Sequence, residues 1–419
     1  MSLTLDSIAF NHDPLSSARS ALNIRRNKDF EVLLPEWPLP PGVMPRERPA
    51  AYSMSDTYRE DVIVKAAVSA TVTGDYEIRA TGGGVLGAIA PTTVSIASGA
   101  TVIVDALLSG RRFSNVGRHD VQWKWSYRPV GAGNWTNLAT TEHRIYITLA
   151  APMAPWTQTA ASPYLPWADL LEYVCAAAGG SGQNSGVAIA RTLVWAIYES
   201  LNLHYDVVTY GSVRYGFTVA GDQFELSEWI EYVLSNQPPS ATVCDPESGT
   251  HPLEQVVACY DTAASLALMC AIVGVDLRYQ LHDPFGYLNP CYPIGRPLSN
   301  NPHYFPSCIS QRPLVGADTG RAAFANHTYT TDTNGLIFDA CLRAEVSWCA
   351  YVIYLVVAII WALVLRLDLA YKYWDLAHGV VTLRSQQDYE TTFIDVSALF
   401  EAAEAGGSPV TQVIDFSTM

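Results

Sequence analysis

The alternation of apolar and polar residues between positions 121 and 127 is the feature that most limits how this chain can fold. Every second position carries a large apolar side chain, with a polar one between: Val121, Gln122, Trp123, Lys124, Trp125, Ser126 and Tyr127. Because successive side chains of a strand point to opposite faces, the pattern predicts an antiparallel strand with one buried face. Short β-branched runs separated by Gly, Asn and Thr turns surround it. We therefore predict an immunoglobulin-like β-sandwich over residues 59–150, although the cysteine pair of an antibody domain is missing.

The segments on either side of this region have a different character. Residues 1–58 contain prolines at 35, 38, 40, 41, 45 and 49 and predict an extended N-terminal arm packed on a domain. Residues 151–166 are rich in proline again and predict a linker packed against its neighbours. Helical patterns follow, over 167–179, 187–202 and 226–234. The fold class predicted for the 419 residues is α+β, with two or three folded units.

Composition and charge exclude several classes of function. Hydrophobic residues make up 49% of the chain, too many for a disordered protein. The net charge of -15 would repel a phosphate backbone, so nucleic acid is not an expected partner. No two of the eight cysteines have the spacing of a zinc ribbon or a thioredoxin motif, and we expect no metal and no cofactor. The N-terminus lacks the pattern of a secretory signal, which predicts a cytoplasmic, reducing location with free thiols.

A cysteine near the start of a predicted helix is the first candidate for chemistry. The helix is predicted over residues 256–274, with Gly274 at its end and a turn-rich stretch before it. Cys259 then falls in the first turns, where the positive end of the helix dipole stabilises a thiolate. A buried helical cysteine is usually inert, as we predict for Cys270, so Cys259 needs a partner base before it predicts a nucleophile.

A predicted β-hairpin supplies such a base and a group to orient it. Residues 325–330 and 336–340 read as strands joined by a turn that ends at Gly335. His327 and Asp339 lie on these strands, and neighbouring strands would bring the carboxylate within hydrogen-bonding distance of the imidazole. His251 and the pair His282 and Asp283 are alternative titratable groups nearby in the sequence.

In their order along the chain, these residues resemble the transglutaminase-like (papain-like) superfamily of cysteine enzymes. The resemblance rests on the helical Cys259, then Gly274 and Arg278, then the His327 and Asp339 strands, and covers residues 164–345. It implies a transglutaminase-like α+β catalytic domain over 167–419, and a sandwich domain often precedes this core. It also implies Cys259 as the nucleophile, His327 as general acid and base, and Asp339 as the orienting residue.

The resemblance further implies an oxyanion site and has two departures. The backbone N–H of Cys259 would donate to the oxyanion together with one side chain, for which Gln255 is the nearest candidate. Ala258 stands where the family has a glycine before the cysteine, and Thr328 follows the histidine in place of the usual aromatic residue. Neither departure removes a reacting group.

An apolar run over residues 346–365 has two interpretations. Ser347 is its only clearly polar member, and aromatic residues such as Trp348 and Trp361 lie near its ends, as in a membrane-spanning helix. Its β-branched residues and its start only seven residues after Asp339 favour instead a buried helix or pair of strands. Contact with a membrane is therefore one expectation and burial in the core the other; the oligomeric state is not predicted.

Together with these residues, the resemblance implies a cysteine hydrolase or acyltransferase of the transglutaminase-like type. Its substrate would be an amide, in a peptide or protein, attacked through a Cys259, His327 and Asp339 triad with an acyl-enzyme intermediate. The alternative is a non-enzymatic binding protein with a degenerate cysteine-enzyme fold, anchored to a membrane if the apolar run spans one. In that alternative, Trp123, Trp125 and Trp135 would bind a partner or a glycan.

Overall fold

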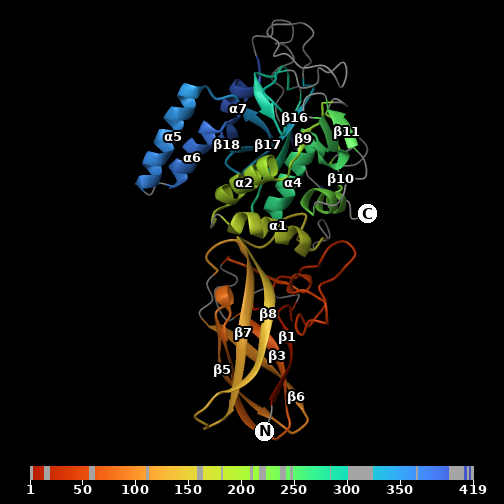
Figure 1. Ribbon diagram of the computed structural model, residues 1–419, viewed down its shortest axis with the longest axis vertical. Coiled ribbons are helices and arrows are strands. Elements are labelled where there is room, and N and C mark those ends of the chain that lie inside the picture. Colours follow the sequence, from red (N-terminus) through yellow and green to blue (C-terminus); the bar gives the residue numbers. More distant parts are fainter. Residues whose placement is uncertain are drawn as a thin grey trace. The chain divides into compact units, whose positions relative to one another are not determined.

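The fold is α+β, as the sequence predicts, and the chain divides into two compact units. Unit 1 comprises residues 1–186 and 272–275, and unit 2 comprises residues 187–271 and 276–419. The computed structural model (Figure 1) describes residues 3–13, 19–55, 62–109, 113–157, 164–180, 183–207, 211–216, 223–235, 242–245, 249–283, 285–300, 324–364, 367–395, 410–412 and 415–416.

Unit 1 is built on one curled sheet of eight strands. The strands are β1 (Leu3–Ala9), β2 (Ala50–Ser53), β3 (Ile63–Ala70), β4 (Gly74–Gly82), β5 (Ala88–Ile96), β6 (Thr101–Ser109), β7 (Gly117–Pro129) and β8 (Thr136–Thr148). Their order is β1-β3-β6-β5-β4-β7-β8-β2, with antiparallel neighbours except for the parallel pair of β2 and β8. Two of the strands, β1 and β2, come from the segment predicted as an extended arm.

The alternation predicted for residues 121–127 is confirmed on β7. Trp123 and Trp125 are fully buried. The Trp125 indole N–H donates to the Thr141 hydroxyl at 3.1 Å, and that of Trp123 donates to the Gly87 carbonyl at 2.9 Å. The hypothesis that these two rings bind a partner is therefore wrong, because they fill the core of unit 1. Trp135 is half-buried beneath the guanidinium groups of two arginines.

The helices of unit 1 are short and lie beside its longest strands. Helix α1 (Ala168–Gly179) packs against β7 and β8, and it begins and ends where the proline and glycine signals predict. The Cys175 thiol on this helix donates to the Ile147 carbonyl of β8 at 3.8 Å. Two single 3-10 turns, η1 (Pro45–Glu47) and η3 (Gly84–Leu86), complete the described helical elements of this unit.

Unit 2 contains an antiparallel sheet with the order β15-β17-β16-β14-β19, and β18 pairs with β17 beside this path. These strands are β14 (Arg278–His282), β15 (Cys291–Pro293), β16 (His327–Thr331), β17 (Ile337–Ala344), β18 (Val380–Arg384) and β19 (Val410–Gln412). Three two-stranded pairs join β9 (His204–Tyr205) with β13 (Val256–Val257), β10 (Gln223–Phe224) with β20 (Asp415–Phe416), and β11 (Thr242–Asp245) with β12 (Gly249–Pro252).

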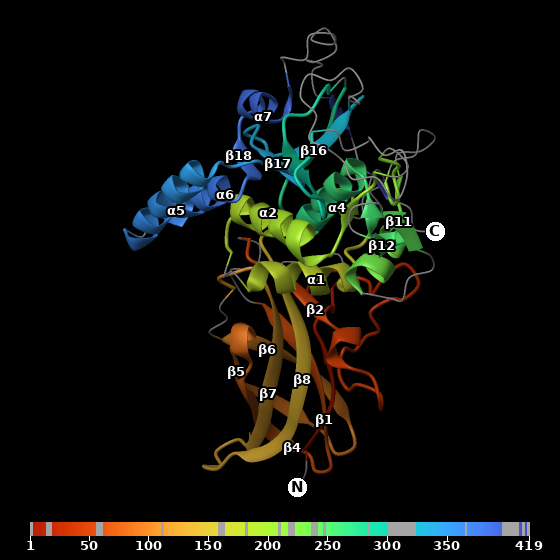
Figure 2. The same cartoon turned by 45° about the horizontal axis from the view of Figure 1, so that its top comes forward.

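Unit 2 has helices where the sequence predicts them over residues 187–202 and 226–234, and two later helices that were not predicted, α6 (Leu367–Ala377) and α7 (Gln386–Phe393) (Figure 2). The other helical elements are α2 (Gly186–Trp195) with the π-helical turn η4 (Ala196–Ser200), α3 (Leu226–Glu228) with η5 (Trp229–Leu234), the 3-10 turn η6 (Leu253–Gln255), α4 (Cys259–Ile272) and α5 (Trp348–Leu363). The predicted start of the α4 helix is corrected, because Val256 and Val257 form strand β13 and the helix begins at Cys259. Its predicted end is confirmed by Gly274, whose φ of +79° favours glycine.

The predicted hairpin is confirmed as β16 and β17. Its turn is held by Asp332, whose carboxylate accepts the backbone N–H groups of Asn334 and Leu336 at 2.9 Å each. Gly335 has a φ of +78°, which a residue with a Cβ rarely adopts. This local geometry brings His327 and Asp339 onto neighbouring strands.

The apolar run forms helix α5, which lies side by side with α6 (Figure 1). Ala358 is its one buried residue, so the prediction that the run is buried in the core is wrong. Exposed fractions run from 39% at Val352 to 78% at Leu363 among the exposed apolar side chains, which are Trp348, Val352, Ile353, Val356, Ile359, Ile360, Leu363 and Val364. In the described part of the chain, every helix is too short or too polar to cross a membrane.

This exposure predicts that α5 tolerates loss of apolar side chains. Ile353→Ala should change the free energy of unfolding by less than about 0.5 kcal/mol, because the side chain is 59% exposed. Ile189→Ala on α2 is the matched control: this isoleucine is fully buried, and its truncation should cost about 2 to 4 kcal/mol. Urea denaturation of both variants measures the difference, and equal losses would contradict the exposed position of α5.

Candidate active site

Cys259 is the first residue of α4, and the chain reaches it from strand β13. Its thiol takes part in no disulfide, and the residue is 3% exposed. As the first helical residue, it has a backbone N–H without a partner inside the helix, at the positive end of the helix dipole. This position suits both a thiolate and an oxyanion formed next to it.

Asp261 fixes this end of the helix. Its carboxylate accepts the N–H of Ala258, the residue before the helix, at 2.8 Å, which is one half of a capping box. It also accepts the N–H groups of Tyr215 at 2.6 Å and Gly216 at 2.8 Å, and that of Arg214 at 3.0 Å. Burial raises the pKa of Asp261 to about 6, while these N–H donors favour its charged form. The carboxylate thus ties the loop 214–216 to the residue preceding Cys259.

His327 and Asp339 form a buried pair on β16 and β17. The His327 Nε2 atom lies 2.9 Å from Asp339 Oδ2, and both side chains are almost completely enclosed. The other carboxylate oxygen, Oδ1, accepts the backbone N–H groups of Cys341 at 2.6 Å and Leu342 at 3.2 Å. The Tyr389 hydroxyl donates to Oδ2 at 2.7 Å.

These contacts decide how the imidazole is protonated. Each carboxylate oxygen of Asp339 accepts two hydrogen bonds, which occupies the acceptor positions of a carboxylate. Asp339 is therefore an ionised acceptor, and His327 must donate to it through an Nε2–H. The Nδ1 atom remains for exchange of a proton with another group.

The electrostatics of the site connect His327 with Cys259. Burial by itself lowers the pKa of His327, but the charges of Asp339 and Cys259 outweigh it and raise this pKa to about 10. Nδ1 makes no hydrogen bond of ordinary geometry to the described residues, yet Cys259 is near enough to contribute to the raised pKa of the ring. Cys259 is also near Tyr205 and Tyr279. Burial of these two phenols raises their pKa values, and the charge of Cys259 raises them further.

The remaining predicted candidates lie in different surroundings. Gln255 accepts a hydrogen bond from the Asn202 amide at 3.1 Å, and no described contact joins it to Cys259. His251 stacks on His204 with ring centroids 3.7 Å apart. His282 pairs across from His327 in the sheet and is fully buried. Of the side chains that the sequence singled out, His327 and Asp339 are joined by a hydrogen bond. Cys259 interacts electrostatically with the His327 ring.

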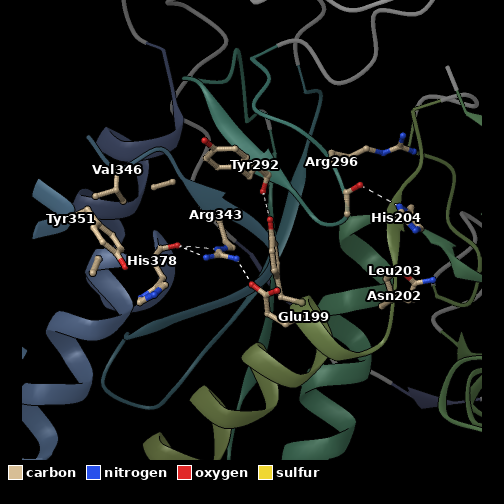
Figure 3. Close-up of a pocket in the computed structure, with 14 residues that line it drawn as sticks. Glu199, Asn202, Leu203, His204, Tyr292, Arg296, Arg343, Val346, Tyr351 and His378 are labelled. Atoms are coloured by element: carbon tan, nitrogen blue, oxygen red, sulfur yellow. Dashed lines mark hydrogen bonds and ion pairs between the residues drawn. The ribbon is translucent and has the colours of Figure 1, made fainter. Parts of the chain in front are cut away.

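A pocket of about 590 Å³ lies in unit 2 and shares elements with the site (Figure 3). Arg343 crosses it, donating to the His378 carbonyl at 2.7 Å and pairing with Glu199. Arg343 belongs to β17, as Asp339 does, and the lining residue His204 belongs to β9, the partner of the strand before Cys259. Cys259, His327 and Asp339 are not part of the described lining. The opposite charges of Arg343 and Glu199 offset each other. This pair therefore gives the pocket no preference for an anionic or a cationic ligand.

Comparison with known proteins suggests no function for this site, so its residues are interpreted from their geometry. No protein-family model matches the chain, and a search of curated proteins found none similar to it. Within the described ranges, no group of three or more His, Cys, Asp or Glu side chains is arranged to hold a metal ion.

Two residues of the site were missed by the sequence analysis. Asp261 could have been found, because an acidic residue at the third helical position is a capping signal. Tyr389 carries no such signal: it lies 50 residues after Asp339, on a helix whose place beside β17 only the tertiary structure shows.

The Asp261 contacts predict a large effect on stability. Asp261→Ala should lower the free energy of unfolding by about 3 kcal/mol or more, because it leaves several buried N–H groups without an acceptor. Asp332→Ala, which removes a half-buried turn carboxylate, is the control and should cost about 1 kcal/mol or less. Urea denaturation measures both, and a similar small loss for the two variants would contradict the role of Asp261.

The His327 contacts predict a pH dependence of stability. The imidazole binds its proton more tightly in the folded chain, with a pKa of about 10 against the ordinary 6.5. Its contribution to the free energy of unfolding is thus complete below pH 6.5 and is lost as the pH rises through about 10. Denaturation at several pH values should show the advantage of the wild-type chain over His327→Gln shrinking across this window. A constant difference between the two proteins would contradict the pairing.

Proposed function

We propose that the chain is a cysteine hydrolase or acyltransferase of the transglutaminase-like type, acting on an amide in a peptide or protein. The observation that carries the proposal is the buried pair of His327 and Asp339, with the charge of Cys259 acting on the same imidazole. A nucleophile, a base and a group that orients the base are the minimum set for amide acyl transfer.

The proposed reaction follows from the roles of these atoms. The Cys259 thiolate attacks the amide carbonyl carbon, and the negative charge moves to the carbonyl oxygen beside the Cys259 N–H. The carbon–nitrogen bond then breaks, and the His327 Nδ1–H gives its proton to the leaving amine. Water or a second amine attacks the thioester, His327 takes its proton, and the thiolate is released. Asp339 keeps the Nε2–H in place throughout.

The proposal includes the finer fold of each unit. For unit 2 we propose the transglutaminase-like α+β fold, supported by the order of a cysteine helix, a histidine strand and an aspartate strand. For unit 1 we propose an immunoglobulin-like sandwich. It is supported by Phe10, which follows β1 and stacks on Trp123 of β7 with ring centroids 5.8 Å apart, so that distant strands of the curled sheet face each other. We propose a cytoplasmic, reducing setting, since the mechanism needs a free Cys259 thiol.

The mechanism predicts selective alkylation of Cys259. At pH 6, a thiol of ordinary reactivity is only about 0.3% thiolate, whereas an imidazolium beside Cys259 favours the thiolate. Iodoacetamide at pH 6 should therefore modify Cys259 at least about tenfold faster than Cys349, the matched control on α5, which is exposed. Mass spectrometry of digests measures each rate.

Two variants complete this test. His327→Ala should abolish the advantage of Cys259. Asp339→Asn should keep the thiol alkylatable but lower turnover by orders of magnitude, because an amide stabilises the imidazolium poorly. Turnover is followed as new amino termini in a mixture of denatured proteins, for hydrolysis, and as incorporation of a fluorescent primary amine, for transfer. Slower alkylation of Cys259 than of Cys349 in the wild-type chain would reject the mechanism and favour the binding-protein alternative.

A further inference from the structure

Tyr389 reaches the catalytic carboxylate from helix α7. Its hydroxyl donates to Asp339 Oδ2 at 2.7 Å, and the same oxygen accepts the His327 Nε2–H at 2.9 Å. The side chain is fully buried, and burial and the Asp339 charge raise the pKa of the phenol well above its ordinary value. Tyr389 is thus a hydrogen-bond donor at any pH at which the protein would work.

The helix that carries Tyr389 is fixed at both ends. Asn289 holds its C-terminal end: its side-chain amide donates to the carbonyls of Thr392 and Ile394 at 3.1 Å each, and its backbone N–H donates to Phe393 at 2.8 Å. At the other end, the Ser385 hydroxyl caps the helix by accepting the Asp388 N–H at 3.3 Å. The position of the hydroxyl is therefore set by the fold and not by a mobile side chain.

We propose that Tyr389 is a positioning residue of the triad, which fixes Asp339 and withdraws part of the negative charge that acts on His327. This inference rests on the proposed function. An oxygen that accepts two hydrogen bonds attracts each donor less strongly, so the imidazolium gives up its proton to the leaving amine more readily. Among the described residues, the polar and titratable groups that face His327 from the surrounding elements are Cys259 of α4, His282 of β14, Tyr329 of β16, Asp339 of β17 and Tyr389 of α7.

Tyr329 provides a matched control. It is a buried tyrosine two residues after His327, its ring lies 4.8 Å from that of Tyr389, and its hydroxyl has no hydrogen-bond partner among the described residues. Tyr329→Phe and Tyr389→Phe therefore remove the same atom from neighbouring buried rings. Only the second removal takes a donor away from Asp339.

The experiment is a pH titration of His327 in the full chain, followed by NMR with histidine labelled at the ring carbons, the resonance being assigned with His327→Gln. Tyr389→Phe should move the midpoint upward by about half a pH unit, because the carboxylate then stabilises the imidazolium more strongly. It should also lower turnover about threefold to tenfold with KM unchanged. Tyr329→Phe should leave the midpoint where it is in the wild-type chain.

A second substitution should move the His327 midpoint in the opposite direction while it keeps the hydroxyl and the packing. Placing 3-fluorotyrosine at position 389 makes the phenol a stronger donor and should lower the midpoint. An unchanged midpoint in both altered chains, or equal shifts in Tyr389→Phe and Tyr329→Phe, would overturn the inference. Because the titration needs no substrate and no reactive thiol, its result is separate from the alkylation test of Cys259, whose failure would reject the proposed function itself.

Discussion

Burial of the Asp339 carboxylate is the constraint on which the arrangement of unit 2 depends. A buried anion is stable only when its lone pairs are satisfied, because the loss of water costs several kcal/mol. Asp339 meets this requirement with donors from three parts of the chain: the following residues of its own strand, His327 on β16 and Tyr389 on α7. Satisfying one carboxylate therefore joins a hairpin to a helix near the end of the described chain, and it sets the tautomer of the histidine as a consequence.

Asp261 is a second buried carboxylate whose oxygens must also be satisfied, and it uses a different set of donors. Its hydrogen-bond partners among the described residues are all backbone N–H groups, from the loop 214–216 and from Ala258. Asp339 by contrast also accepts from two side chains, His327 and Tyr389, of which His327 can give up its proton. Asp261 thus fixes the backbone around Cys259, and Asp339 acts on a titratable ring. Backbone donors make a rigid support, whereas side-chain donors make a site whose charge can change.

The parts of this fold that the sequence predicted are those where local pattern and tertiary contact agree. The alternation of β7 reports a half-buried strand directly, and the turn after Thr331 needs little more than the Asp332 side chain and a glycine. The prediction that the apolar run of α5 is buried was wrong, because hydropathy indicates a preference for burial but not where a segment packs. The helix leaves Ile353 and Leu363 exposed. Gln255 was chosen for its nearness in sequence to Cys259, but the residue lies before β13 and its side chain contacts Asn202. Tyr389 was missed because its contact with Asp339 spans 50 residues.

The distribution of charge explains why such a buried arrangement would favour the proposed chemistry. In the proposed mechanism, the site before attack holds a thiolate, an imidazolium and a carboxylate, three charges in an enclosed volume. Attack on an amide moves the thiolate charge to the carbonyl oxygen, and loss of the amine removes it together with the His327 proton. The acyl-enzyme then holds one charge, on Asp339, where four hydrogen-bond donors already surround it. Burial, which penalises every uncompensated charge, therefore lowers the free energy of the acyl-enzyme relative to the state that precedes it.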